Sequence, residues 1–353
     1  MTREIPAGLA SSKAGASPFL KACRREPTPY TPVWLMRQAG RYMPEYRAVR
    51  EKLEFLELCH HPEAAAEVTV HAALRLGVDA AIIFADILLV LEPLGVGLAF
   101  TKGDGPAIAN PVRSPADVDR LAPYDTADTL AYVYEAIRLA KRELRVPLIG
   151  FAGAPFTLAS YLIEGGGSRN YVHTKSLMYH HPGAWHRLLS LLAKLVNAYL
   201  KSQVAAGADA VQLFDSWVGC LAPNDYRQYV LPHTRAAIAG LEPETPVIHF
   251  GTDTAGLLES VRETGASVVG LDWRVDLGVE WDRLGDGVAV QGNLDPVALF
   301  GPITEIRRRA QAILEQAARR PGHIFNLGHG ILPQTPVDHV LALVETVHEM
   351  SAR

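Results

Sequence analysis

Eight short runs rich in apolar and β-branched residues alternate along this chain with segments of helical length. None of the runs alternates cleanly between polar and apolar residues, which is typical of strands buried on both faces of a parallel sheet. Parallel strands need a crossover between them, so this order strongly constrains the fold. The runs are Val33–Met36, Ala80–Phe84, Val146–Phe151, Ala210–Phe214, Val247–Phe250, Ser267–Leu271, Val288–Gln291 and His323–Leu327.

The segments between the runs carry helical patterns, and they include Pro62–Leu76, Thr129–Glu143, Trp185–Ala206, Asp225–Ala239, Thr254–Thr264, Ile303–Arg319 and Pro336–Ser351. Repeated strand–helix units predict an α/β fold, a single distorted (β/α)8 TIM barrel with loop excursions over its C-terminal face. The longest excursion, residues 91–127, predicts a loop layer or hairpin over one end of the barrel. A doubly wound open sheet is the alternative. It is weakened because no Gly-x-Gly-x-x-Gly follows the first run.

Length and composition fit one barrel. The chain has 353 residues, of which 48% are hydrophobic and 20% charged, the balance of a globular protein with a large core. Residues 1–16 are rich in Ala, Ser and Gly without periodicity, and we interpret them as a flexible N-terminal tail. We expect residues 17–353 to form the barrel domain.

Charge and cysteine content exclude several classes of protein. The formal charge of −4 gives no reason to expect nucleic acid or an anionic membrane as partner. The longest apolar run, Ala80–Leu91, contains Asp86 and is too short to span a bilayer. Cys23, Cys59 and Cys220 are too few and too scattered for a disulfide framework. Because no secretory signal pattern opens the chain either, we expect a cytoplasmic protein.

One stretch concentrates arginine on this acidic background: Arg37, Arg41, Arg47 and Arg50 stand against the single acid Glu45. Guanidinium groups bind carboxylates or phosphates through two parallel hydrogen bonds. A solvated helix face is the plainer interpretation. The first apolar run leads directly into Arg37, however, and strand ends are where α/β proteins hold ligands. We therefore interpret the cluster as a binding site for a polyanion.

Asp86 is the most informative single residue, because apolar side chains flank it on both sides in IIFADILLVL. Burying an unpaired polar group costs about 2–7 kcal/mol, and burying an unpaired carboxylate costs more. Asp86 could cap a helix or pair with an internal Arg. It could also be presented to a cationic or N–H-rich ligand.

Polar side chains follow other runs as well. His329 lies between Gly328 and Gly330 after the eighth run, Ser216 follows the fourth, and Tyr161 lies on the segment after the third. Strand ends of a parallel barrel meet at one face, so these residues are candidates for one site. The sequence has no Gly-x-Ser-x-Gly nucleophile motif and no metal-ligand spacing, so we expect no metal.

These motifs together resemble the uroporphyrinogen decarboxylase family. The resemblance extends from Pro32 to Pro333, and the matching segments occur in the family's order: WLMRQAGRYMPEYR, FADIL, GAPFTLASYLIEGGGS, FDSW, HFG, GLDW, QGNLDP and FNLGHGILP. It implies a distorted (β/α)8 barrel, usually a homodimer with facing active-site clefts. It also implies a cofactor-free lyase of haem and porphyrin biosynthesis, which converts the four acetate side chains of uroporphyrinogen III to methyl groups and releases coproporphyrinogen III and CO2.

The resemblance also implies roles for particular residues. Substrate contacts fall on Arg37, Gln38, Ala39, Gly40, Arg41, Arg50, Asp86, Tyr161, Ser216 and His329. Among these, Asp86, Arg37, Tyr161 and His329 are the expected catalytic residues. Asp86 would face the pyrrole N–H groups and stabilise a cationic intermediate. The proton donor stays open between Arg37, His329 and a relayed water. Ala85 departs from the Ser that many members carry, without affecting Asp86 itself.

Two other functions compete with this interpretation. Zinc or corrinoid methyltransferases of the same superfamily resemble one another in a His-x-Cys after the fifth strand and a later Cys, because they use zinc-bound thiolate. Here that place reads His249-Phe250-Gly251, and no Cys follows Cys220. The second alternative is a non-catalytic tetrapyrrole-binding protein. The intact set of expected catalytic residues argues against it.

Overall fold

The computed structural model describes residues 17–101 and 105–353. The tail predicted at residues 1–16 lies outside the described residues. Seven parallel strands form one curled sheet in the order β1-β4-β5-β6-β7-β8-β9. Their bounds are β1 Ala81–Ile82, β4 Leu148–Gly153, β5 Ala210–Asp215, β6 Val247–Gly251, β7 Val268–Gly270, β8 Ala289–Gln291 and β9 His323–Ile324. Seven of the eight predicted runs are therefore strands of one parallel α/β sheet.

The eighth predicted strand, at Val33–Met36, is not a regular strand. Val33 forms only an isolated parallel bridge to Phe325, and its carbonyl accepts a hydrogen bond from the Asp79 N–H at 2.8 Å. Beyond Trp34, side chains replace the sheet partners. The Leu35 N–H donates to Gln38 Oε1, and the Met36 N–H donates to Asn326 Oδ1. The chain then turns into the arginine-rich loop instead of continuing the ladder.

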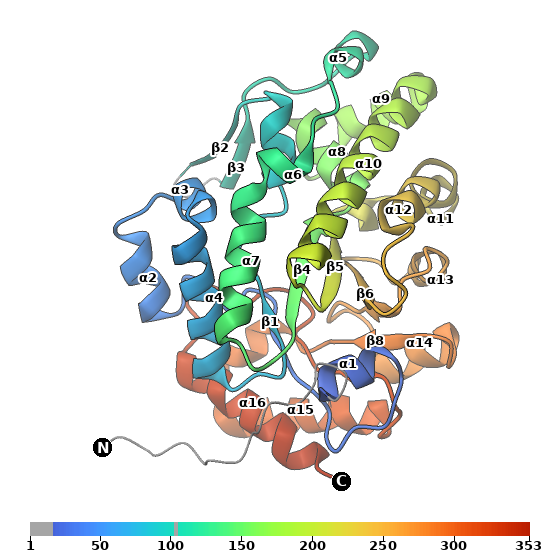
Figure 1. Ribbon diagram of the computed structural model, residues 1–353. Helices are drawn as coiled ribbons and strands as arrows, with labels where there is room; N and C mark the ends of the chain where they lie inside the picture. The colour runs from blue at the N-terminus through green and yellow to red at the C-terminus, as the bar shows by residue number, and fades with distance from the viewer. Residues whose placement is uncertain (1–16, 102–104) are drawn as a thin grey trace.

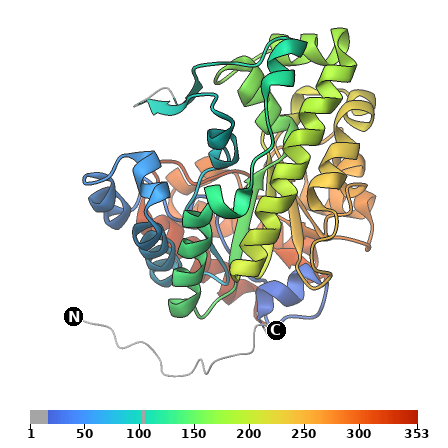
Figure 2. The same ribbon diagram turned by 45° about the horizontal axis from the view of Figure 1, so that its top comes forward.

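Helices surround the strands, and in both views the hairpin β2–β3 projects at one end (Figures 1 and 2). The helix predicted at Pro62–Leu76 is confirmed as α4, because Pro62 occupies its first turn and Gly77 ends it at φ 65°. The other helices are α1 Pro18–Cys23, α2 Pro44–Arg50, α3 Phe55–His60, α5 Pro115–Arg120, α6 Thr126–Thr129, α7 Ala131–Glu143, α8 Pro155–Glu164, α9 Val172–His180, α10 Pro182–Ala206, α11 Pro223–Asp225, α12 Leu231–Ile238, α13 Leu258–Arg262, α14 Leu277–Leu284, α15 Ile303–Ala317 and α16 Val337–Ser351.

The hairpin predicted within residues 91–127 is confirmed. It consists of β2 Leu98–Thr101 and β3 Gly105–Ile108, paired antiparallel. The Ile108 N–H donates to the Gly165 carbonyl, so the hairpin attaches to the end of α8. The segment that follows β4 is thereby covered on one side.

Polar side chains cross the buried middle of the sheet. Trp34 Nε1 donates to Gln291 Oε1 at 2.9 Å, and Gln291 Nε2 donates to Gln212 Oε1 at 3.1 Å. All three residues are almost fully buried. This chain of bonds ties the Val33 bridge to β8 and β5, and it fixes the base of the loop that begins at Arg37.

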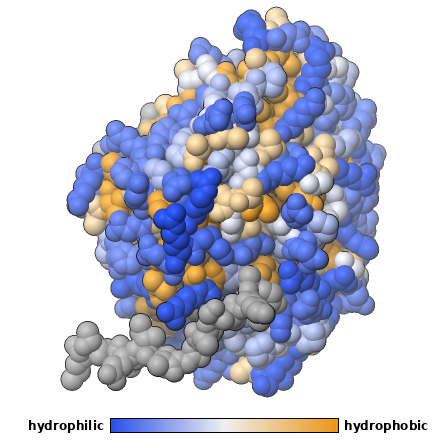
Figure 3. Space-filling view, viewed as in Figure 1, coloured by the Kyte–Doolittle hydropathy of each residue, from blue (hydrophilic) through white to orange (hydrophobic). Residues whose placement is uncertain are grey.

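The face drawn in Figure 3 is mixed in hydropathy. Hydrophilic side chains cover most of the face in Figure 3, with small hydrophobic areas between them. No helix among residues 17–101 and 105–353 combines the length and apolar character needed to cross a bilayer.

Candidate active site

Arg37 lies across the glycine that follows His329. A Cβ placed on Gly330 would come within 2.4 Å of Arg37 Cδ, so only glycine leaves room for this side chain. Arg37 itself has a φ of 63°, a conformation that non-glycine residues rarely adopt. The backbone thus turns sharply to send the guanidinium from the first run toward the end of β9.

Gln38 is turned away from this surface. Its side chain is fully buried, accepts from the Leu35 N–H at 3.2 Å and donates to the Ala80 carbonyl at 3.2 Å. The Tyr42 hydroxyl donates to its backbone carbonyl. Gln38 therefore holds the loop in shape. Few of its polar atoms remain free for the predicted contact with the substrate.

The next residues present unused backbone donors. The N–H groups of Ala39, Gly40 and Arg41 have no hydrogen-bond partner in the part of the chain that the structure describes. Arg47 donates to the carbonyls of Arg41 and Tyr42 at 3.1 and 3.0 Å, which fixes the outer side of the loop. The Arg41 side chain is exposed. The loop can therefore meet an anion with both N–H and guanidinium groups.

Arg50 is held by local partners at the end of α2. It donates to the Leu53 carbonyl, lies 3.8 Å from Glu54 Oε2, and places its guanidinium 5.8 Å from the Phe55 ring centroid. These contacts keep Arg50 beside its own helix. Its predicted role as a substrate contact requires that it release at least one of them.

Asp86 follows β1 and keeps one carboxylate oxygen available. Oδ1 accepts from the Leu88 N–H at 2.8 Å, whereas Oδ2 has no hydrogen-bond partner among the described residues. Burial raises the pKa of Asp86 to about 6, and the Leu88 bond and the Arg37 charge oppose this shift. This bond closes a local turn. It is not a helix cap, because the short helix that follows, Leu89–Leu94, has Leu88 as its N-cap residue and no side-chain cap bond. The bond uses only half of the carboxylate and leaves an acceptor for a ligand.

Arg37 and Asp86 share one electrostatic environment without forming an ion pair within 4 Å in the described chain. Burial lowers the pKa of Arg37, while the nearby Asp86 raises it and Arg41 lowers it further. The Arg37 side chain is nevertheless exposed to solvent. An exposed group with a desolvated charge is typical of the wall of a cleft.

Tyr161 projects from α8 into the same environment. Its ring stacks on Trp217, with centroids 3.7 Å apart and planes inclined by 29°. Burial and the Asp86 charge together raise the pKa of Tyr161 to about 12, and the Arg37 charge opposes this rise. The Tyr161 hydroxyl has no hydrogen-bond partner within the described ranges. It is thus a neutral donor whose pKa responds to both Asp86 and Arg37.

His329 is a neutral hydrogen-bond donor at neutral pH. Its Nδ1 accepts from the Gly330 N–H at 2.7 Å, so the proton of the neutral ring lies on Nε2. Burial, together with the charges of Arg37 and Arg274, lowers the pKa of His329 to about 4. His329 can therefore donate to a carboxylate, but it carries no extra proton to supply as an acid.

Ser216 lies beside a buried network that the sequence pattern did not reveal. The Ser216 carbonyl accepts from the Thr252 hydroxyl, and its own hydroxyl has no partner among the described residues. One residue earlier, Asp215 accepts from the Thr157 hydroxyl at 2.8 Å and lies 3.5 Å from His249 Nε2. Both members of that pair are fully buried. In the sequence, Asp215 within the FDSW segment was the residue that could have indicated this network.

Arg274 was also missed by the sequence interpretation. It follows β7, pairs with Asp272 at 2.8 Å and Asp253 at 2.9 Å, and lies 4.0 Å from the Trp273 ring centroid. The Trp273 and His329 rings form a T-shaped pair, with centroids 6.3 Å apart. Arg274 thus adds a cation to the rim near His329, although two carboxylates already neutralise much of its charge.

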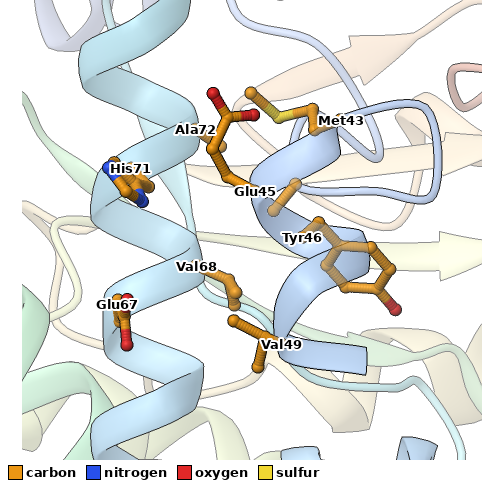
Figure 4. A pocket seen from close by; sticks show the side chains of 9 residues that line it. Met43, Glu45, Tyr46, Val49, Glu67, Val68, His71 and Ala72 are labelled. Atoms are coloured by element: carbon orange, nitrogen blue, oxygen red, sulfur yellow. The ribbon is translucent and has the colours of Figure 1, made fainter. Parts of the chain in front are cut away.

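Figure 4 shows a small pocket between α2 and α4 that is separate from this site. Its lining residues are Ala39, Met43, Glu45, Tyr46, Val49, Glu67, Val68, His71 and Ala72. Only Ala39 is shared with the residues above, and Glu45 is already paired with Arg75 at 3.0 Å. We interpret this pocket as the packing seam of two helices. Across the described chain, no three His, Cys, Asp or Glu side chains are placed to hold a metal ion.

The fold places the chain in a broad class. It is similar to a methyltransferase from Methanosarcina mazei, with a TM-score of 0.82, 20% identity and coverage of 96% of this chain and 99% of that one. A B12-independent methionine synthase from Shewanella superposes with a TM-score of 0.56 at 13% identity, covering 82% and 87%. At such identities the likeness concerns the fold alone, which is an α/β fold of TIM-barrel type.

The family is defined by sequence. The family model described as "Uroporphyrinogen decarboxylase (URO-D)" matches residues 15–350. The uroporphyrinogen decarboxylase of Chloroflexus aurantiacus is 59% identical over 335 residues, 93% of this chain and 94% of that protein. The one from a Roseiflexus species is 58% identical over 344 residues, covering 95% and 99%. The chain belongs to the uroporphyrinogen decarboxylase family, and the resemblance inferred from its motifs is confirmed.

Proposed function

We propose that this protein removes the carboxyl groups of the four acetate side chains of uroporphyrinogen III, giving coproporphyrinogen III and CO2 without a cofactor. The observation that carries the proposal is Asp86. It has a raised pKa and one unused oxygen, and Arg37 and Tyr161 lie in its field, in a chain of this family. A ring of pyrroles fringed with carboxylates needs such an acceptor at its centre and cations at its rim.

We assign the rim of the substrate to the arginine-rich loop. Arg37, Arg41 and the free N–H groups of Ala39 and Gly40 can each donate a hydrogen bond to a carboxylate. His329 Nε2–H and the hydroxyls of Tyr161 and Ser216 supply further neutral donors. Asp86 Oδ2 then accepts hydrogen bonds from the inward pyrrole N–H groups, which satisfies the carboxylate that the fold leaves half paired.

The chemistry follows from this placement. Protonation of a pyrrole ring carbon creates an iminium-like cation, and the bond to the acetate carboxyl then breaks, so that its electron pair neutralises the cation and CO2 leaves. The exocyclic methylene takes up a proton to become methyl, and the ring carbon loses the one it gained. Each decarboxylation thus consumes one proton, and the conversion of all four acetate side chains consumes four. Asp86 stabilises the cation, an effect worth about 3–4 kcal/mol for comparable preorganised groups. Arg37 and water remain as candidate donors.

A turnover assay tests the function. Purified protein incubated anaerobically with uroporphyrinogen III should release CO2 and accumulate coproporphyrinogen III. Tight binding without turnover would instead identify a tetrapyrrole-binding protein. Activity that collapses on chelation and returns with zinc would favour the methyltransferase interpretation.

The pH dependence of the reaction should report Asp86. Because its pKa is about 6, the carboxylate needed for the cation is lost below that pH. We expect kcat/KM to fall about tenfold per pH unit on the acid side. His329, whose pKa is about 4, stays neutral over the same range. Arg37→Met should move the inflexion upward, because the Arg37 charge lowers the pKa of Asp86. A profile that is flat through pH 6 would remove Asp86 from the mechanism.

His329→Asn should raise KM about tenfold and let partly decarboxylated intermediates escape, on the scale of one lost positioning contact. The reason is that His329 is a neutral Nε2–H donor, so it anchors the substrate but supplies no proton. Single-turnover rates and the distribution of intermediates would measure this. Complete loss of the first decarboxylation with unchanged affinity would make His329 the proton donor instead.

We further propose that the Val33 run acts as the eighth strand and closes the sheet into a (β/α)8 barrel. The bridge to Phe325 on one side and the bond from Asp79 on the other support closure between β9 and β1. The protein is proposed to act in the cytoplasm as a homodimer with facing clefts, as the family resemblance implies. Sedimentation at micromolar concentration would test the dimer.

A further inference from the structure

We propose that Tyr171 and Trp217 form an aromatic clamp that positions Tyr161 for the reaction. The inference rests on the proposed function, because Tyr161 has its role there. None of the sequence motifs assigned a role to either clamp residue. They come from two separate segments, since Tyr171 precedes α9 and Trp217 follows β5.

The rings of the clamp meet in series. Trp217 stacks face to face on Tyr161, with centroids 3.7 Å apart. Tyr171 forms a T-shaped pair with Trp217, with ring centroids 5.4 Å apart and planes inclined by 64°. Both geometries are favourable for aromatic pairs. Trp217 therefore lies between Tyr161 and Tyr171 and transmits the position of one to the other.

Ring packing matters here because the Tyr161 hydroxyl lacks a hydrogen-bond partner in the described chain. A tyrosine with a bonded hydroxyl is fixed at both ends, whereas Tyr161 is oriented by its ring alone. The Asp86 and Arg37 charges act on this hydroxyl in opposite directions. Loss of the stack would let the hydroxyl move relative to both groups.

Tyr171 is held in a strained backbone conformation, which supports its proposed role in positioning Trp217. Its φ of 52° and ψ of 41° lie in the left-handed region, which is unusual for a bulky side chain. The surroundings enforce it. The Tyr171 N–H donates to Ser168 Oγ at 3.0 Å, Glu164 accepts from the Thr174 N–H at 2.9 Å, and Lys175 Nζ donates to the Cys220 carbonyl at 2.6 Å.

Trp217 is anchored from the buried side. Its N–H donates to Thr157 Oγ1 at 3.3 Å, and the Thr157 hydroxyl donates to Asp215. Thr157 and Tyr161 lie one turn apart on α8, so the same helix carries both the anchor of Trp217 and the ring on which it stacks. The backbone of Trp217 is thus fixed, and Tyr171 completes the restraint on its ring.

Tyr171→Asn tests the clamp, because Asn tolerates positive φ and removes only the ring. We expect kcat/KM to fall about tenfold, less than the roughly 100-fold cost of a misplacement of about 1 Å, because Tyr171 acts on Tyr161 only through Trp217. Tyr171→Phe keeps the ring and should restore activity to within about twofold of the parent. Tyr179→Asn is the matched control, because Tyr179 lies within α9, the helix that Tyr171 precedes, and packs against Tyr229 with ring centroids 6.1 Å apart. It should leave kcat/KM unchanged.

A double-mutant cycle separates positioning from a general structural effect. Tyr161→Phe should lower kcat/KM at least about tenfold in the parent but less than about threefold in the Tyr171→Asn background, because the hydroxyl is already misplaced there. Near-UV circular dichroism should show a loss of the Tyr161–Trp217 signal in Tyr171→Asn, while far-UV spectra and Tm confirm folding. Additive effects, or Tyr171→Asn activity equal to the parent, would overturn the clamp. An inactive parent with normal near-UV spectra would instead refute the proposed function.

Discussion

Asp86→Asn should yield a folded protein whose kcat on uroporphyrinogen is at least about 100-fold lower, the scale of removing one preorganised group that stabilises charge in the transition state. Asparagine is nearly isosteric, and its side-chain oxygen can still accept from the Leu88 N–H. It cannot neutralise a cationic intermediate. Substrate affinity should change less than kcat, because the lost interaction strengthens only as positive charge develops.

The same substitution should leave stability equal or higher. Burial raises the pKa of Asp86 from 3.8 to about 6, so ionisation costs the folded state and Asp86 destabilises the protein above about pH 6. This cost disappears as pH falls toward 3.8, and asparagine removes it at every pH. Thermal unfolding at pH 7 beside steady-state kinetics would measure both effects. A folded variant with near-normal turnover would show that Asp86 takes no part in the reaction.

Arg37→Lys should lower kcat/KM about 100-fold although the charge is kept. An ammonium cannot form the two parallel hydrogen bonds of a guanidinium, and a misplaced contact of this kind costs about that factor. Gly330→Ala should displace the same guanidinium without changing Arg37 itself, because the new Cβ would come within 2.4 Å of Arg37 Cδ. The two variants should therefore show similar losses.

Arg308→Lys provides the control, since Arg308 lies on the exposed face of α15 and binds Glu305 through two hydrogen bonds. It offers the same chemistry away from the candidate active site, so kcat/KM should match the parent. Steady-state kinetics with all three variants decides the matter. If Arg37→Lys and Gly330→Ala both retain parental kcat and KM, the arginine-rich loop is solvated surface.

Much of the fold follows from local sequence. Buried parallel strands read as apolar runs, and seven of the eight predicted runs are strands of one sheet. Helix ends are similarly local, as Pro62 and Gly77 show for α4. The candidates Arg37, Asp86, Tyr161 and His329 were found because polar residues interrupt the apolar pattern where strands end. Their roles as substrate contacts remain predictions.

The tertiary structure decided how these residues are used, because the deciding contacts join segments far apart in sequence. The first run gives up its ladder to the side chains of Gln38 and Asn326, so Gln38 points into the core although it lies beside Arg37. The sequence by itself determined the alternation of strands and helices and the residues at the strand ends. Only packing decided which ring steadies Tyr161, which nitrogen of His329 carries its proton and how far burial shifts the pKa of Asp86, since each depends on neighbours that the fold brings together.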